Sequence, residues 1–366
     1  MPRLALPGRA WYSKPMIQLD NTMSSLLLPW YAAKHRDLPW RRDQEPYHVW
    51  LSEIMLQQTR VEAVLGYYRR FLEALPDLPS LAACPDDRLY KLWEGLGYYA
   101  RARNLRKAAQ QVMERHGGQF PEQYDQVRAL AGIGDYTAAA ICSICFDLPA
   151  PAVDGNVLRV VTRLAACRSD ILRAETKREV TAALAEVYPV GCRGEFNQAM
   201  MELGAMVCGP NREPDCVSCP LSTLCQSRAG GLWREIPCRA AKKPRKQAER
   251  TVLLLRCGGL YAVNRRPARG LLAGMWEYPN VEGLLSAQAA LSLAADWGCR
   301  PAAILRMAEK KHIFTHIQWQ MRGYFLDCQA APPPLTWVKA ETLEKELSLP
   351  TAFRQFTEEW AALRPE

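Results

Sequence analysis

Apolar residues in the first part of the chain recur at the three- and four-residue spacing of amphipathic helices. Glycine and proline interrupt this pattern often enough to divide it into helices of ordinary length. We therefore predict an all-α domain over residues 25–232. The clearest helical sets are Trp50, Ile54, Val61, Val64, Leu65, Tyr68, Phe71 and Leu72, then Phe196, Met200, Leu203 and Val207.

The pattern changes after position 250. Residues 251–256 and 260–263 predict short strands around Gly258 and Gly259, and residues 318–328 alternate like a strand. Residues 281–297 and 351–363 have helical patterns instead. We predict a smaller α+β domain over 251–366, and a length of 366 residues agrees with two domains.

Residues 233–250 separate the two patterns and are strongly basic. They contain seven Lys or Arg residues and two Glu residues, so +5 of the chain's +9 net charge lies here. With two prolines and little apolar periodicity, the segment predicts an exposed basic linker. It either contacts phosphates, which we prefer, or is a solvated connector. Residues 1–24 are predicted to be an N-terminal extension, with Met1 or Met23 as the start.

Composition disfavours membrane and secreted classes. No apolar run approaches the roughly 18 residues that a membrane span needs, and residues 26–31 are too short for a signal peptide. Thirteen cysteines are an odd number in a long chain, which argues against a disulfide framework. We expect a reducing, cytoplasmic setting in which some thiolates bind metal.

Four cysteines lie close together after a helical pattern, in the order Cys208-x7-Cys216-x2-Cys219-x5-Cys225. Four thiolates in so short a segment predict a metal or cluster site. Zinc is an alternative, but zinc sites usually pair two C-x-x-C knuckles and this segment has one. The spacing therefore favours a [4Fe–4S] cluster over zinc by a small margin.

Gly132 and Gly134 stand two residues apart before a helical pattern. Such glycines permit a tight hairpin whose backbone N–H groups, with the following helix N-terminus, suit a DNA phosphate. This contact grips the DNA backbone without reading its sequence. By itself, an ordinary interhelical turn is the more common meaning of the pattern.

Two carboxylates are candidates for acid–base chemistry. Glu53 stands in an apolar helical run, where it either faces solvent or is buried with a raised pKa suited to a general acid. Asp154 precedes a helical pattern, and locally an N-cap is the simplest explanation. A protonated acid and an ionised carboxylate together are what cleavage of an N-glycosidic bond requires.

Three further motifs are Leu38-Pro-Trp-Arg41, Trp93-Glu-Gly-Leu-Gly-Tyr-Tyr-Ala-Arg101 and Val153-Asp-Gly-Asn156. Together with the motifs above, they occur in the order found in MutY-type adenine DNA glycosylases. The chain resembles that family, which belongs to the helix-hairpin-helix, [4Fe–4S] superfamily shared with endonuclease III, from about position 25 to its end. One departure is the spacing between Cys208 and Cys216, where the family has six residues and this chain has seven.

The resemblance implies removal of adenine mispaired with 8-oxoguanine or guanine from double-stranded DNA, with adenine flipped out of the stack. Glu53 would protonate adenine N7, and Asp154 would stabilise the oxocarbenium-like sugar. Tyr136 stands where the endonuclease III branch has its lysine nucleophile, which implies a monofunctional enzyme. The resemblance further implies that Gln58 and Tyr98 wedge into the duplex, and that Trp40, Arg41, Leu56, Thr59 and Asn156 form or surround the base pocket.

The C-terminal domain resembles the MutT (Nudix) fold, most clearly over residues 270–279. The acidic Mg²⁺-binding helix of true Nudix hydrolases is missing from the following segment, so we expect no pyrophosphatase activity. The resemblance instead implies that His312, Phe314, Thr315 and His316 read 8-oxoguanine. The family usually has serine where Thr315 stands, and threonine retains the serine hydroxyl as a donor and acceptor.

Other functions remain as alternatives. They are a bifunctional glycosylase/lyase, which Tyr136 disfavours, and a non-catalytic DNA-binding module or a Nudix hydrolase. We expect a monomer in the bacterial cytoplasm, associated with the nucleoid through DNA. The sequence does not identify protein partners.

Overall fold

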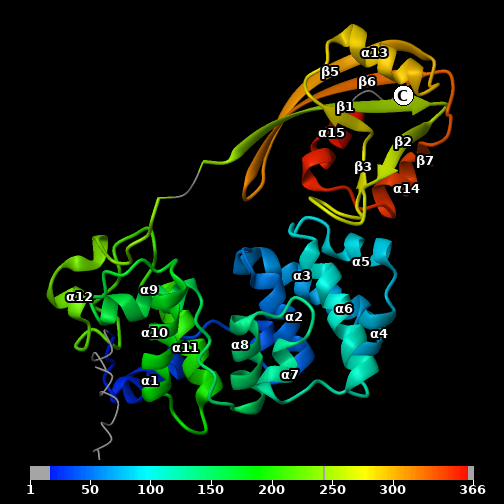
Figure 1. Cartoon of the computed structure of the whole chain (residues 1–366). Coiled ribbons are helices and arrows are strands. Elements are labelled where there is room, and N and C mark those ends of the chain that lie inside the picture. Colours follow the sequence, from blue (N-terminus) through cyan, green and yellow to red (C-terminus); the bar gives the residue numbers. More distant parts are fainter. Residues whose placement is uncertain (1–16, 242–243, 362–366) are drawn as a thin grey trace, which may run out of the picture. The chain divides into compact units, whose positions relative to one another are not determined.

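A computed structural model describes residues 17–241 and 244–361 (Figure 1). Its contacts define two compact units that are interleaved along the chain. The first contains the described residues up to Glu53 together with Phe120–Ala241, and the second contains Ile54–Gln119 together with the described residues from position 244.

The first unit is helical and is organised around helix α11. This helix contacts α1, α8 and α9. A glycine allows the close approach to α9, because a Cβ added at Gly204 would lie only 2.6 Å from the Cβ of Asn156. The elements are α1 (Met23–Lys34), a 3-10 helix (Pro39–Arg41), α2 (Pro46–Leu56), α7 (Tyr124–Arg128), α8 (Asp135–Phe146), α9 (Gly155–Leu164), α10 (Ala174–Glu186), α11 (Arg193–Met206), α12 (Gln226–Ala229) and a second 3-10 helix (Leu232–Arg234).

The start of the described chain belongs to the core of this unit. Ile17 and Met23 are buried in the same cluster as Val160 of α9 and Met200 of α11. The predicted N-terminal extension therefore contributes core residues at positions 17 and 23. Positions 1–16 lie outside the described residues.

In its described residues, the second unit combines seven helices with a seven-stranded mixed sheet. The main strand order is β3-β2-β1-β6-β5; β4 also pairs with β1, and β7 with β2. Strands β1 and β6 run parallel, and the other pairs are antiparallel. The helices preceding the sheet are α3 (Val61–Ala74), α4 (Leu78–Ala83), α5 (Asp86–Trp93) and α6 (Ala100–Arg115). The strands are β1 (Lys246–Cys257), β2 (Leu260–Arg265), β3 (Trp276–Glu277), β4 (Asn280–Glu282), β5 (Pro301–Ile313), β6 (Ile317–Cys328) and β7 (Thr336–Lys339), with helices α13 (Ala287–Asp296), α14 (Ala340–Lys345) and α15 (Thr351–Ala361).

The central strand β1 is buried on both faces. Val252 and Leu254 belong to the core formed with α15, whereas Leu253 and Leu255 belong to the core formed with α13. This double burial explains the uninterrupted apolar run in the sequence, because strands covered on both faces do not alternate with polar residues. The result is a layer of helix on each side of the sheet.

The predicted all-α and α+β parts are confirmed, with corrections at element boundaries. The predicted helix 281–297 is wrong at its beginning: Val281 lies in β4, where it pairs with Thr251 of β1. Strand pairing overrides the helical pattern there, and the helix begins only after Ser286, which caps it by accepting a hydrogen bond from the Ala289 N–H.

The predicted basic linker also differs from the structure. Its last five residues, 246–250, belong to β1 and pair with the beginning of β6. Residues 242–243 of the linker, and the end of the helix predicted over 351–363, lie outside the described residues. Within the described ranges, no helix has both the length and the apolar character to cross a bilayer.

Candidate active site

Glu53 lies near the end of α2 and is only 8% exposed. Burial raises its pKa to about 7; a hydrogen bond with Tyr136 opposes the rise, the charge of Asp154 adds to it, and the charge of Arg41 opposes it. A buried carboxyl with such a pKa is protonated in about half of the molecules at neutral pH. It therefore has the property that a general acid needs.

Asp154 is the N-cap of α9, as the local sequence predicted. Its carboxylate accepts hydrogen bonds from the backbone N–H of Val157 (2.8 Å) and from Asn156 Nδ2 (2.7 Å). Burial raises its pKa, whereas these hydrogen bonds favour the ionised form. Because its charge also raises the pKa of Glu53, the cap places a second carboxylate beside the first.

Tyr136 lies in the first turn of α8 and connects this site to α11. It hydrogen-bonds with Glu53 and donates to Met201 Sδ at 3.2 Å. Burial, together with the charges of Glu53 and Asp154, raises the pKa of its phenol well above the ordinary value. The hydroxyl therefore stays neutral at physiological pH.

Glu202, which the sequence analysis did not identify, forms ion pairs with two arginines at this site, Arg36 and Arg41. It is 1% exposed and accepts from Arg36 Nε and Arg41 Nη2, each at 2.7 Å. Burial would raise its pKa, but these hydrogen bonds lower it to about 2. The missed signal is an acid inside the apolar helical run 196–207, the same signal that indicated Glu53. Trp40, beside Arg41 in the 3-10 helix, is buried.

The turn between α7 and α8 contains the two predicted glycines. Gly132 has a φ of +76°, which favours glycine. Gly134 is the N-cap of α8 at a φ of −95°, and an added Cβ there would meet nothing within 4 Å. The short helix–turn–helix is present, and Gly134 faces open space that another molecule can approach closely.

Cys208, Cys216, Cys219 and Cys225 line one cavity of about 30 Å³, so the structure brings the four predicted ligands together. The longer first spacer closes because Asp215 N–H donates to the Val207 carbonyl (3.1 Å). Arg163 Nη1 lies 3.1 Å from Cys208 Sγ, where its charge would stabilise a thiolate. The donor set fits a thiolate-bound group, although no three His, Cys, Asp or Glu side chains of the described residues converge on one ion position.

In the second unit, two predicted wedge residues have unusual backbones. Gln58 has a φ of +59° and Tyr98 a φ of +48°, and both side chains are exposed. A non-glycine residue at positive φ is uncommon and is often maintained for function.

Arg101, which the sequence reasoning included in a motif but not among the site residues, holds both of these loops. Its Nη1 donates to the carbonyls of Ile54 (2.7 Å), Met55 (2.9 Å) and Gln57 (2.8 Å). Its Nη2 donates to the carbonyls of Leu96 and Gly97 and to Thr59 Oγ1 (3.3 Å). The half-exposed Leu56 lies between the bonded carbonyls of the first loop.

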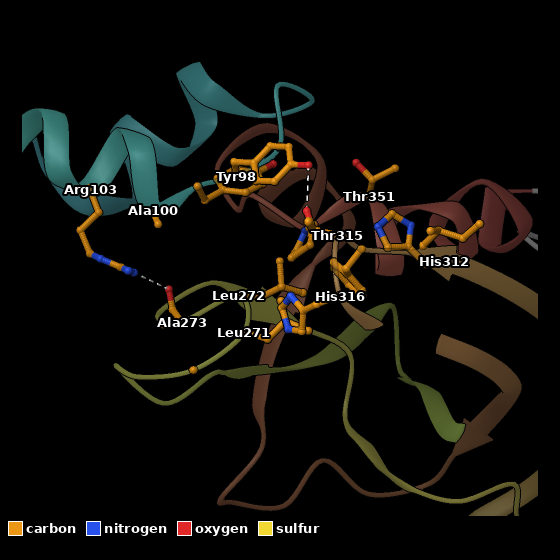
Figure 2. Close-up of a pocket in the computed structure, with 16 residues that line it drawn as sticks. Tyr98, Ala100, Arg103, Leu271, Leu272, Ala273, His312, Thr315, His316 and Thr351 are labelled. Atoms are coloured by element: carbon orange, nitrogen blue, oxygen red, sulfur yellow. Dashed lines mark hydrogen bonds between the residues drawn. The ribbon is translucent and has the colours of Figure 1, made fainter. Parts of the chain in front are cut away.

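A cavity of about 530 Å³ lies in the second unit between the Tyr98 loop and the sheet (Figure 2). The Tyr98 hydroxyl is 3.0 Å from Thr315 Oγ1, which lies with His316 in the turn between β5 and β6. The cavity is lined by residues 270–273 and by His312, Phe314, Thr315 and His316, the four residues predicted from the sequence. The rings of His312 and Phe314 pack edge to face with their centroids 4.5 Å apart.

Comparison with known proteins assigns the helical part and the sheet-containing part of the chain to two different families. The family of HhH-GPD superfamily base excision DNA repair proteins matches residues 51–189, and the NUDIX domain family matches residues 251–359. The chain is 35% identical to the adenine DNA glycosylase of Homo sapiens, covering 86% of this chain and 70% of the human protein, and 34% identical to that of Mus musculus, covering 91% and 77%. A thermostable thymine-DNA glycosylase structure superimposes with a TM-score of 0.52 at 27% identity, covering 57% of this chain and 96% of that one.

Proposed function

Because the chain belongs to the adenine DNA glycosylase family, we propose that it excises adenine paired with 8-oxoguanine or guanine from duplex DNA and leaves an abasic site. The chain is a DNA N-glycosylase of base excision repair. The observation that carries the proposed chemistry is the buried Glu53, whose pKa of about 7 allows it to hold a proton at neutral pH.

In the proposed reaction, Glu53 protonates N7 of a flipped adenine, which makes the base a better leaving group. Extrusion of the base costs a few kcal/mol, and less for a mispair. General acid catalysis of this kind typically contributes about 10²–10⁴-fold in rate. Tyr136 keeps Glu53 oriented through their hydrogen bond.

Asp154 would stabilise the positive charge that develops on the sugar as the base leaves. Its hydrogen bonds from Val157 N–H and Asn156 Nδ2 favour the ionised form that this role needs. Water then attacks the sugar. A phenol cannot form the Schiff base that a lysine forms, so Tyr136 supports a monofunctional reaction rather than the lyase alternative.

The proposal is tested by single-turnover excision from duplexes that place adenine opposite 8-oxoguanine, guanine, cytosine or thymine. We expect excision opposite the first two, and strand breaks only after alkali. Glu53→Gln should abolish excision while mispair binding persists, and the exposed control Glu186→Gln should behave like the parent protein. Breaks without alkali, or a borohydride-trapped adduct, would show a lyase instead.

We propose that the 530 Å³ cavity reads the purine opposite adenine. Thr315 offers one hydroxyl that can donate and accept, and Tyr98 contacts it. Thr315→Ala should reduce the preference for 8-oxoguanine over guanine, Thr315→Ser should retain it, and the exposed control Thr336→Ala should leave it unchanged. Full preference in Thr315→Ala would remove Thr315 from this role.

DNA contact through backbone phosphates is proposed for the turn at Gly132 and Gly134 and for the basic segment 233–250. Affinity for duplex should then fall steeply as salt concentration rises. We further propose a monomer, which light scattering of the purified protein would test; a stable dimer would contradict it.

We propose that the four cysteines hold a [4Fe–4S] cluster, with zinc as the alternative. A bound cluster would supply a structural cross-link between the end of α11 and the segment around α12. Metal analysis and visible absorption distinguish iron from zinc. Cys225→Ser should lose the metal, whereas Cys238→Ser, which is outside the cavity lining, should retain it.

A further inference from the structure

The Tyr136 hydroxyl has one hydrogen and two neighbours that can accept it. One is the Glu53 carboxyl, and the other is the sulfur of Met201 on α11, at 3.2 Å. Nothing in the proposed reaction uses this methionine. Its side chain is half-buried, and a thioether can accept a hydrogen bond but cannot donate one.

The two states of Glu53 need opposite roles from this hydroxyl. An ionised Glu53 can only accept, so Tyr136 must donate to it. A protonated Glu53 can donate to the phenol oxygen, but the phenol hydrogen then needs another acceptor, and the Met201 sulfur lies within hydrogen-bonding distance.

We propose that Met201 is a positioning residue, whose sulfur accepts the Tyr136 hydrogen so that the phenol oxygen can accept the proton of Glu53. The inference rests on the proposed acid role of Glu53 and adds a residue to it. Without the sulfur, Glu53 in its ionised form is the acceptor that remains for the Tyr136 hydrogen among the described residues of this site. Loss of Met201 Sδ therefore favours the form that cannot protonate a base.

The charges around Glu53 do not depend on this sulfur. They come from Asp154 at the start of α9, from Arg41 in the 3-10 helix, and from Tyr136 and Cys145 on α8 if these ionise. Glu202 of α11 is paired with Arg41. Replacing Met201 by leucine changes none of these groups and nearly conserves volume, so it isolates the hydrogen bond.

The test is the pH profile of single-turnover adenine excision by the full chain. Met201→Leu should move the alkaline fall in rate to lower pH by about half to one unit, the effect of one ordinary hydrogen bond. Above the midpoint this is a loss of about 3–10-fold, with little change near pH 5.5. Met201→Gln, which restores an acceptor, should return the midpoint toward that of the parent protein.

Two controls separate this role from simple packing. Met206→Leu changes another half-buried methionine of α11 and should leave the profile unchanged. In a Tyr136→Phe background, Met201→Leu should cause no further shift, because the coupling acts through the hydroxyl. A uniform loss at all pH values, or the same shift when the hydroxyl is already absent, would overturn the proposal.

A second readout does not depend on activity. Carbon-13 NMR of protein labelled at glutamate side-chain carboxyls, with Glu53 assigned by comparison with Glu53→Gln, follows its titration directly. A lower midpoint in Met201→Leu supports the inference even if Glu53→Gln proves active and the acid role is wrong. An unchanged midpoint refutes the inference and leaves the proposed excision untouched.

Discussion

Replacing Glu53 by glutamine is expected to stabilise the protein at high pH. In the unfolded chain this carboxyl titrates near its ordinary pKa of 4.5, but in the folded protein burial raises the pKa to about 7. Since the folded pKa is the higher one, the stability linked to this group is fully present below 4.5 and is lost as pH rises through 7. The shift corresponds to about 3 kcal/mol at about 1.4 kcal/mol per pKa unit.

Glutamine is neutral at every pH and has nearly the same shape, so it should not incur that loss. We expect the difference in unfolding free energy between Glu53→Gln and the parent protein to be small near pH 4.5. It should grow to about 3 kcal/mol in favour of the variant by pH 8.5. For a helical unit of this size, that is a rise in melting temperature of roughly 6–12 °C.

Circular dichroism at 222 nm reports the melting of the helices, and recording both proteins at pH 5 and pH 8.5 removes the contribution of other titrating groups. The exposed Glu186→Gln provides a matched control whose effect should not depend on pH. A melting difference that is equal at the two pH values would refute the buried, half-protonated state of Glu53. A parent protein more stable than Glu53→Gln at pH 8.5 would also refute it.

Three further predictions concern the same site and its supports. Single-turnover excision should fall about tenfold per pH unit above about pH 7, as Glu53 loses its proton; a flat profile to pH 9 would contradict this. Arg101→Lys should lower duplex binding and the melting temperature, because an ammonium cannot reach carbonyls in two loops at once; unchanged binding would show that the loops hold their shape without it. Gly204→Ala should reduce excision at least several-fold, because the added methyl would lie 2.6 Å from the Cβ of Asn156 and must displace the start of α9, including Asp154. The control Ala205→Ser, at the exposed neighbouring position, should have no effect.

Local pattern was enough to predict much of the fold. The strand at 318–328 and the helix from 351 follow the periodicity of their apolar residues, and the N-cap at Asp154 follows from the residue type alone. The start of the helix predicted at 281 failed because pairing of Val281 with β1 is a tertiary interaction, which no local pattern contains. The same reason explains why the linker prediction missed the first residues of β1.

The candidate site was predictable where a residue carries its own signal. Glu53 stands out as an acid in an apolar run, and Glu202 carries the same signal on α11. Arg101 and Met201 carry none, because their importance comes from the groups that surround them: carbonyls of two loops in one case, a phenol in the other. Such roles depend on distances across the fold.

The hydrogen bonds of Arg101 have a consequence for the entropy of its two loops. One guanidinium joins the backbone of the Gln58 loop to the backbone of the Tyr98 loop, so the two loops are held in one arrangement. The conformational entropy of ordering them is lost once, when the protein folds, and not again at each base pair that is tested. If Gln58 and Tyr98 wedge into the duplex, as the family resemblance implies, the protein should lose little affinity to loop ordering at each base step that it tests.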